Sequence, residues 1–189
     1  MPSALVWSGE HWILYLKEQG QSENSGSVSL YHTYYSPAGQ GTVAFFQSDK
    51  AGLGQTLFAE TVELADFIIE KVVSWESSPF EQDIPIAIGN FIRSGDIRSN
   101  PKWRIETDAH VVETEWTGLE PEVVIDSPLK SGAFTIINSV LFFSTTATMK
   151  VNGRPVSGNP FIREGWRRAI GRPGSSCCFA LAETMMRSS

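Results

Sequence analysis

The feature that most constrains the fold of this chain is an alternation of apolar and polar residues, with a period of two, in short segments between residue 84 and the C-terminus. Trp103 and Ile105 alternate with charged residues, and residues 112–116 repeat the pattern with two glutamates on the polar side. Such alternation is typical of antiparallel strands that have one face in the core and the other in water. Because turn-forming residues separate the segments, we expect a mainly β protein with about nine or ten short strands.

Local signals mark two hairpins. Residues 28–35 and 42–47 are rich in aromatic and β-branched residues, and a Ser-Pro-Ala-Gly turn separates them. Asn152 and Gly153 follow the alternating segment 146–151, and both tolerate positive φ, which predicts a tight turn into a short return strand. Further strands are expected over residues 84–92, 103–107, 112–116, 122–125, 134–143 and 176–186.

An antiparallel meander of this kind is expected to close into a barrel of about 8–10 strands, because closure removes exposed edges. We expect residues 1–189 to form this single domain. The segment from Thr56 to Ser74 predicts one long amphipathic helix packed on the barrel, since apolar residues recur there at helical spacing. A short C-terminal helix is expected between Asn159 and Gly171, because Asn-Pro suits a helix start and Gly a helix end.

Thr145 to Gly158, with the sequence TTATMKVNGRPVSG, resembles the strand–Asn-Gly–strand hairpins of bacterial lipocalin-like (calycin-type) β-barrels, including the domains of carotenoid hydratase-like proteins. The resemblance covers about a dozen residues and implies barrel architecture and the handling of hydrophobic small molecules. The Gly-x-Trp motif common at the start of lipocalins is missing. No catalytic residue is carried over from so short a match.

The formal net charge is −6, which argues against a general nucleic-acid binder, because such proteins need a basic face. Residues 150–189 carry a net charge of +5, so the rest of the chain carries −11. Three interpretations of the C-terminal arginines stay open: an anion-binding site, pairing with acidic strand faces such as Glu113 and Glu115, or a solvated helix face with a Glu164–Arg168 pair. The arginines concerned are Arg163, Arg167, Arg168 and Arg172.

Other functional classes lack support in the sequence. Cys177 and Cys178 are adjacent, so they would point to opposite faces of a strand and are expected to be buried, unbridged residues. No histidine or cysteine spacing suits a metal, and no motif indicates a cofactor, so we expect neither. With no signal-peptide pattern and no long apolar run, we expect a cytoplasmic protein without a membrane span.

Three residues are candidates for acid–base chemistry. His32 and Tyr34 share one strand face and could form a proton-donating pair, although a half-buried, hydrogen-bonded histidine is the structural alternative. Glu183 follows Phe179 in period two and is expected to be buried, either as a catalytic acid or in an internal ion pair with Arg93 or Arg163. Side chains expected to contact a ligand inside the barrel are Trp103, Trp116, Asn90, Asn138, Phe142, Phe179 and Arg163.

The sequence therefore favours a carrier or ligand-binding protein that holds a hydrophobic small molecule in the barrel interior. The alternative is a cofactor-independent cyclase, isomerase or hydratase that acts on an apolar substrate by shape and acid–base catalysis. A third possibility is an interaction module that uses the acidic face. A homodimer is left open.

Overall fold

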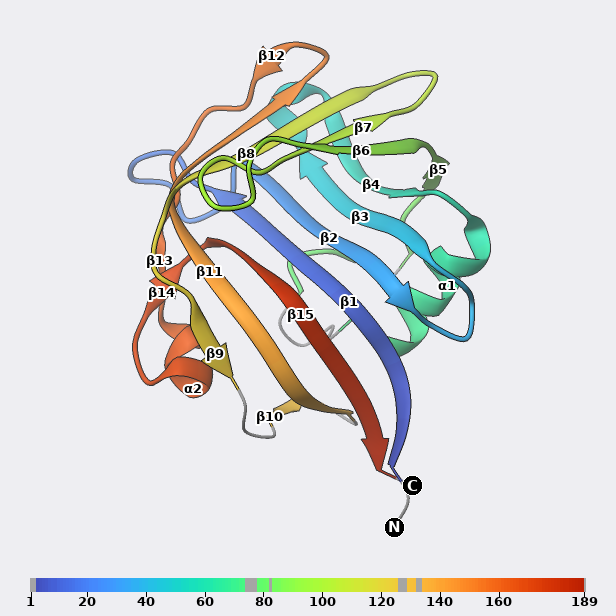
Figure 1. The fold of residues 1–189 in the computed structure, drawn as a ribbon. Coiled ribbons are helices and arrows are strands. Elements are labelled where there is room, and N and C mark those ends of the chain that lie inside the picture. The colour runs from blue at the N-terminus through green and yellow to red at the C-terminus, as the bar shows by residue number, and fades with distance from the viewer. Residues whose placement is uncertain (1–2, 74–77, 82, 126–128, 132–133, 189) are drawn as a thin grey trace.

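The protein is built around one long, strongly curled β-sheet (Figure 1). The computed structural model describes residues 3–73, 78–81, 83–125, 129–131 and 134–188. The first half of the chain contributes β1 (Ser3–Leu16), β2 (Gly26–Tyr35), β3 (Gly41–Ser48), β4 (Leu53–Ala59), β5 (Ile86–Ile88) and β6 (Asn90–Ser94). The second half contributes β7 (Lys102–Glu106), β8 (Val111–Leu119), β9 (Val123–Ile125), β10 (Leu129–Ser131), β11 (Phe134–Val151), β12 (Arg154–Pro155) and β15 (Cys177–Ser188).

The strands follow the order β5-β4-β3-β2-β1-β15-β11-β8-β7-β6, while β9, β10 and β12 each pair with β11. The two ends of this order, β5 and β6, are consecutive in the chain and are separated by Gly89 alone. The sheet therefore forms a nearly closed barrel. The prediction of an antiparallel barrel is corrected in one respect: the barrel is mixed, because β5 returns beside β4 in the parallel direction, with Leu57 opposite Ile86.

The long helix expected from Thr56 to Ser74 is also corrected. Helix α1 spans only Val62–Lys71, and the Thr61 hydroxyl caps it by accepting a hydrogen bond from the Leu64 backbone N–H at 3.2 Å. The preceding residues form β4, in which Leu57 and Phe58 are buried on opposite faces of the sheet. A strand buried on both faces has a continuous apolar run, which a helical pattern can match by coincidence.

The C-terminal helix is shorter than expected. The chain leaves β11 and β12, forms the small two-stranded sheet of β13 (Ile162–Arg163) and β14 (Gly174–Ser175), and turns between them. That connection holds a 3-10 turn at Glu164–Trp166 and the one-turn helix α2 (Arg167–Ile170), which ends at Gly171 with φ 73°. In the part of the chain that the structure describes, no helix is long and apolar enough to cross a bilayer.

Both hairpin predictions are confirmed. Strands β2 and β3 pair in antiparallel register, with Leu30 opposite Ala44. Asn152 and Gly153 have φ values of 50° and 76°, and they join β11 to β12. The segments predicted as separate strands around residues 134–143 and 146–151 form the single strand β11, because β9 and β10 pair with its first half and β8 with its second.

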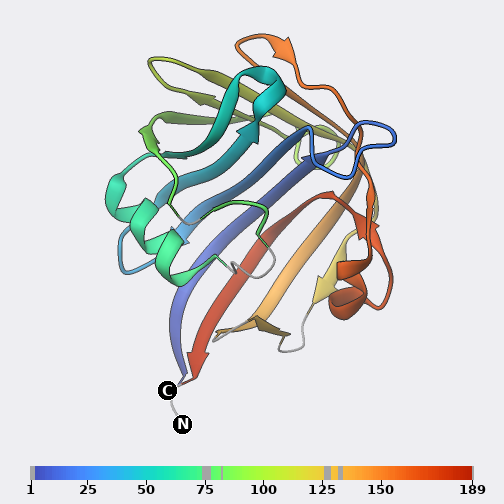
Figure 2. The ribbon, with the colours of Figure 1, turned by 180° about the vertical axis from the view of Figure 1, so that it is seen from behind.

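The central strands contribute to two separate cores. Alternate residues point into the barrel, where Trp12, Trp103 and Trp116 meet and Trp12 stacks on Phe179 with ring centroids 4.2 Å apart. The intervening residues form a second core on the other face of the sheet, beneath α1 on one side and α2 on the other (Figure 2). Cys177 lies in the first core and Cys178 in the second, which confirms that these two free, buried cysteines face opposite ways.

Candidate ligand-binding site

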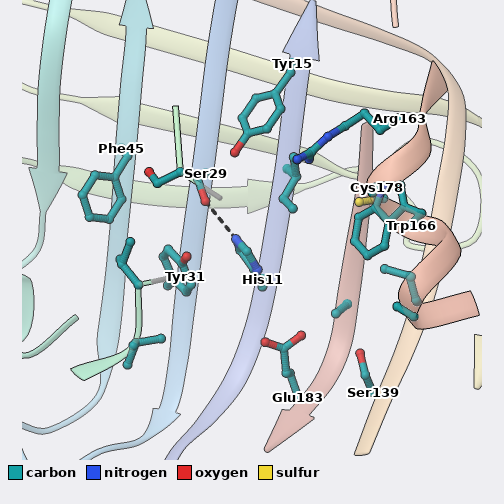
Figure 3. A pocket seen from close by; sticks show the side chains of 18 of the residues that line it. His11, Tyr15, Ser29, Tyr31, Phe45, Ser139, Arg163, Trp166, Cys178 and Glu183 are labelled. Carbon is teal, nitrogen blue, oxygen red and sulfur yellow. Dashed lines mark hydrogen bonds between the residues drawn. The ribbon is translucent and has the colours of Figure 1, made fainter. Parts of the chain in front are cut away.

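A cavity of about 300 Å³ lies in the second core, on the face of the sheet opposite the barrel interior (Figure 3). Strands β1, β2, β3, β11 and β15 form its floor. Its rim consists of the residues that follow α1 and of the segment Gly165–Ala169; those that follow α1 are Val72, Val73, Ser78 and Phe80. Its walls are mostly apolar. The apolar lining includes Ile13, Phe45, Phe80, Leu141, Trp166 and Met185.

His11 and Tyr31 form the polar centre of the floor. They are register partners on β1 and β2, and their rings stack with centroids 4.2 Å apart. His11 Nε2 lies 2.8 Å from the Ser29 hydroxyl oxygen. Burial, reinforced by the charge of Arg163, lowers the pKa of His11 to about 3, so this imidazole is neutral at physiological pH.

The other weakly acidic groups of the floor are also held neutral. Burial raises the pKa of Tyr15 to about 12, although the charge of Arg163 and, to a smaller extent, the Ser29 hydroxyl oppose this shift. Burial also raises the pKa of Tyr31, against a smaller opposing effect of Ser29. Burial likewise raises the pKa of the Cys178 thiol. A thiol of this kind is a poor nucleophile, because the reactive form is the thiolate.

Arg163 extends over the same cavity from β13. Its guanidinium carbon lies 5.2 Å from the centre of the Tyr15 ring, in a cation–π contact. Among the described residues, no carboxylate oxygen lies within 4.0 Å of its side-chain nitrogens. Its positive charge contributes to lowering the pKa of His11, which indicates that its field reaches the cavity floor.

Glu183 enters the cavity because of a β-bulge in β15. Glu183 pairs with Gly9, but His11 pairs with Ala180, so β15 holds one more residue than β1 between these two pairs. The extra residue reverses the side-chain alternation, so Glu183 faces the same way as Cys178 and Ala180. The period-two pattern had placed it with Phe179, which lies in the barrel interior instead.

Glu183 is only 8% exposed, and burial raises the pKa of its carboxyl group to about 7. Within the described part of the chain, no hydrogen bond or ion pair holds this carboxylate, so the expected ion pair with Arg93 or Arg163 does not form. Arg93 instead binds Glu10, and Arg163 lies elsewhere along the same cavity. A carboxyl group whose pKa lies near 7 is partly protonated at neutral pH and can donate a hydrogen bond or a proton in an apolar pocket.

His32 and Tyr34 lie away from this cavity. They share the barrel-facing side of β2, as predicted, with ring centroids 5.1 Å apart. His32 Nδ1 lies 2.9 Å from the Thr42 hydroxyl oxygen, and the Tyr34 hydroxyl donates to the Glu10 carboxylate. Burial raises the pKa of Tyr34 to about 12 and lowers that of His32. The structure thus separates this pair from Glu183 by the thickness of the sheet.

The carboxylate near Tyr34 belongs to a satisfied ion pair. Glu10 has a side chain that is 4% exposed, and it accepts hydrogen bonds from Arg93 at 2.9 and 3.1 Å and from Trp12 Nε1 at 2.9 Å. The Arg93 guanidinium also lies over the rings of Trp12 and Trp103, at 5.3 and 5.9 Å from their centres. These contacts favour a structural role at this end of the barrel.

The expected ligand-contacting residues are distributed differently. Trp103, Trp116 and Phe179 are buried in the barrel core, and Phe142 packs against it. The Trp116 indole N–H donates to the Ile13 carbonyl oxygen at 2.9 Å. Asn90 is exposed on β6, and the side chain of Asn138 lies outside the described residues. Of the nine named side chains that the structure describes, the cavity brings together Arg163 and Glu183.

Sequence reasoning missed the residues of the cavity floor. His11, Ile13 and Tyr15 alternate with Trp12, Leu14 and Leu16, so β1 carries a recognisable strand pattern that is apolar on both faces. The neighbouring Ser29 and Tyr31 alternate in the same way with Leu30 on β2. This alternation could have identified two buried faces, but not the helices that cover one of them.

The basic C-terminal segment pairs only in part with acidic residues. Arg172 binds Glu120 at 3.1 Å, and Arg167 binds Glu164 at 2.5 Å, in place of the predicted Glu164–Arg168 pair. Glu113 and Glu115 bind Arg104 and Lys102 at 2.9 and 3.1 Å, rather than the C-terminal arginines.

Among the described residues, no group of three or more histidine, cysteine or acidic side chains is arranged to hold a metal ion. Comparison of the chain with protein-family models, with curated proteins and with solved structures found no match. The nearly closed barrel is compatible with the lipocalin-like architecture that the hairpin at residues 145–158 implies.

Proposed function

We propose that the protein binds a hydrophobic small molecule, as a carrier or ligand-binding protein, in the cavity between the sheet and the segments around α1 and α2. The observation that carries the proposal is a cavity of about 300 Å³ with aromatic and aliphatic walls and a few inward-facing polar groups. Small-molecule sites have this character and begin at about this volume. The barrel interior, where the sequence suggested a ligand, is filled by tryptophan and phenylalanine side chains.

Dye binding tests this function. Ala169 lines the cavity from α2, and an Ala169→Trp substitution should fill part of the space. We expect the wild-type protein to enhance the fluorescence of the neutral dye Nile red, and the variant to bind it about tenfold more weakly, a loss of about 1.4 kcal/mol. Ala38→Trp, in the turn between β2 and β3 and outside the cavity lining, is the matched control and should bind as the wild type does. Equal affinity in all three proteins, or no binding by the wild type, would contradict the proposal.

A second function, cofactor-independent acid–base catalysis on the bound molecule, is favoured by Glu183. Its carboxyl group lines an apolar cavity, and its pKa of about 7 leaves it partly protonated at physiological pH. A group with a pKa near the working pH is suited to proton transfer. For isomerisation or cyclisation, Glu183 would donate a proton to the bound substrate and its carboxylate would take one back, and hydration would also consume a water molecule.

Glu183→Gln distinguishes the enzyme from the carrier. Native mass spectrometry can identify a molecule that co-purifies with the protein, and that molecule can then be incubated with fresh protein and followed by mass and chromatographic retention. An enzyme should convert it, and the variant should keep Nile red binding within about twofold while conversion falls by about a hundredfold or more. Conversion that survives in the variant would remove Glu183 as the acid, and no conversion by the wild type would leave the carrier function.

The broader expectations belong to the same proposal. A lipocalin-like barrel, a single domain and a cytoplasmic location all fit a small ligand-binding protein, and the two free cysteines are compatible with a reducing compartment. The homodimer stays a prediction.

A further inference from the structure

The charge of the cavity wall identifies the kind of ligand that it suits. His11, Tyr15, Tyr31 and Cys178 are neutral at neutral pH, for the reasons given above. Below pH 7, Glu183 is mostly protonated. Arg163 is then the fixed charge among the described lining residues, so the cavity carries a net charge of about +1.

Arg163 also differs from the other arginines near aromatic rings. Arg93 lies over two tryptophan rings and binds Glu10, and Arg172 lies over Phe143 and binds Glu120. Arg163 lies over Tyr15 and is half-buried, but no described carboxylate lies within 4.0 Å of it. A guanidinium group shielded from water and without a counter-ion gains from an anion more than an exposed one does.

The position of Arg163 gives the cavity two distinct ends. Figure 3 shows Arg163 beside Tyr15 at one end, with Glu183 and Ser139 beyond His11 at the other. The aromatic and aliphatic residues Phe45, Phe80 and Leu141 lie along the walls. A molecule with one anionic group and an apolar body would match this arrangement.

We propose that the ligand is a small amphiphilic carboxylate whose acid group binds Arg163 and whose apolar body fills the cavity. This inference rests on the proposed function, because it names the class of molecule for that same cavity. A carboxylate matches the planar fork of a guanidinium group and can accept two parallel hydrogen bonds from it. The volume of about 300 Å³ favours a medium-chain or aromatic acid over a long-chain lipid.

The test compares decanoate with decanol, which has the same chain length but no charge. Both are titrated at pH 6 against protein that carries Nile red, and displacement of the dye is measured. We expect decanoate to displace the dye at a concentration about tenfold lower than decanol does, which is the effect of one charge-assisted hydrogen-bonded pair. Arg163→Gln should remove this preference and leave decanol within about twofold of its wild-type value, whereas Arg163→Lys should restore part of it.

Arg168→Gln is the control for a change in net charge, because Arg168 lies on α2, is exposed and does not line the cavity. It should keep the wild-type preference for decanoate. If decanoate and decanol bind equally to the wild type, or if Arg168→Gln loses the preference as fully as Arg163→Gln does, the carboxylate inference is wrong although the cavity still binds ligands. If Nile red does not bind, or binds without sensitivity to Ala169→Trp, the proposed function itself fails.

Discussion

Replacing Glu183 with glutamine is expected to stabilise the protein above pH 7, by about 3 kcal/mol at pH 8. Burial raises the pKa of Glu183 in the folded protein to about 7, from 4.5 in the unfolded chain. The folded state therefore binds more protons than the unfolded state between these two pH values. As a result, the free energy of unfolding falls as the pH rises from 4.5 to 7. Glutamine has nearly the same shape and never ionises, so it avoids this loss.

Urea unfolding at pH 5 and pH 8 measures the effect. The gain from Glu183→Gln should be small near pH 5, where the native carboxyl group is neutral, and should reach its full size by pH 8. Glu122→Gln, at an exposed position before β9, is the matched control and should change the free energy of unfolding by less than about 0.5 kcal/mol at either pH. A gain that is the same at both pH values would show that the carboxyl group does not titrate near pH 7.

Those parts of the fold that depend on local signals could be predicted from the sequence. The Asn152-Gly153 turn requires positive φ at two successive positions, and few residue pairs supply it. The β2–β3 hairpin follows from two β-rich segments and a turn between them. A series of such hairpins predicts a mainly β protein whose sheet closes into a barrel, and the structure is a nearly closed barrel.

The remaining features depend on partners distant in sequence. Strand β5 pairs with β4 in the parallel direction although α1 lies between them in the chain, and this pairing joins segments that no local turn signal connects. The division between β4 and α1 also depends on tertiary contacts, because Leu57 and Phe58 are buried on both faces of the sheet. Periodicity within one segment does not report such contacts.

The candidate site shows the same limit at the level of a single residue. The sequence identified Glu183 as a buried carboxyl group, and burial is what raises its pKa. The predicted direction of the Glu183 side chain was wrong, because the bulge in β15 is visible only in its pairing with β1 and β11. A shift of one residue moves every later side chain to the other face, so Glu183 and Met185 enter the cavity while Phe179 stays in the barrel.

Acid is expected to destabilise the protein through His11, by about 3.5 kcal/mol between pH 6.5 and pH 3.5. The pKa of His11 is 6.5 in the unfolded chain and about 3 in the folded protein, where burial and Arg163 disfavour the imidazolium form. The unfolded state therefore binds the extra proton across this range. The stability that depends on neutral His11 is complete above pH 6.5 and is lost as the pH falls toward 3.

The contributions of His11 and Glu183 have opposite signs where their ranges overlap, from about pH 4.5 to 6.5. In that range, acidification lowers the free energy of unfolding through His11 and raises it through Glu183 by a similar amount. The summed contribution of the two residues in the wild type should therefore change little with pH. His11→Gln can keep a hydrogen bond to Ser29. In this variant the free energy of unfolding should no longer fall on acidification through residue 11, but it should still fall through Glu183 as the pH rises from 4.5 to 7.

The double variant His11→Gln/Glu183→Gln is the control that removes both groups. The free energy of unfolding is measured by urea denaturation at each pH from 3.5 to 8 for the wild type, the two single variants and the double variant. Subtracting the value for the double variant from each of the others cancels the contribution of all other titratable groups. The difference should then rise with pH for the protein that keeps only His11, and fall with pH for the protein that keeps only Glu183. Parallel curves for the wild type and His11→Gln below pH 6.5 would mean that His11 takes up its proton as readily in the folded protein as in the unfolded chain.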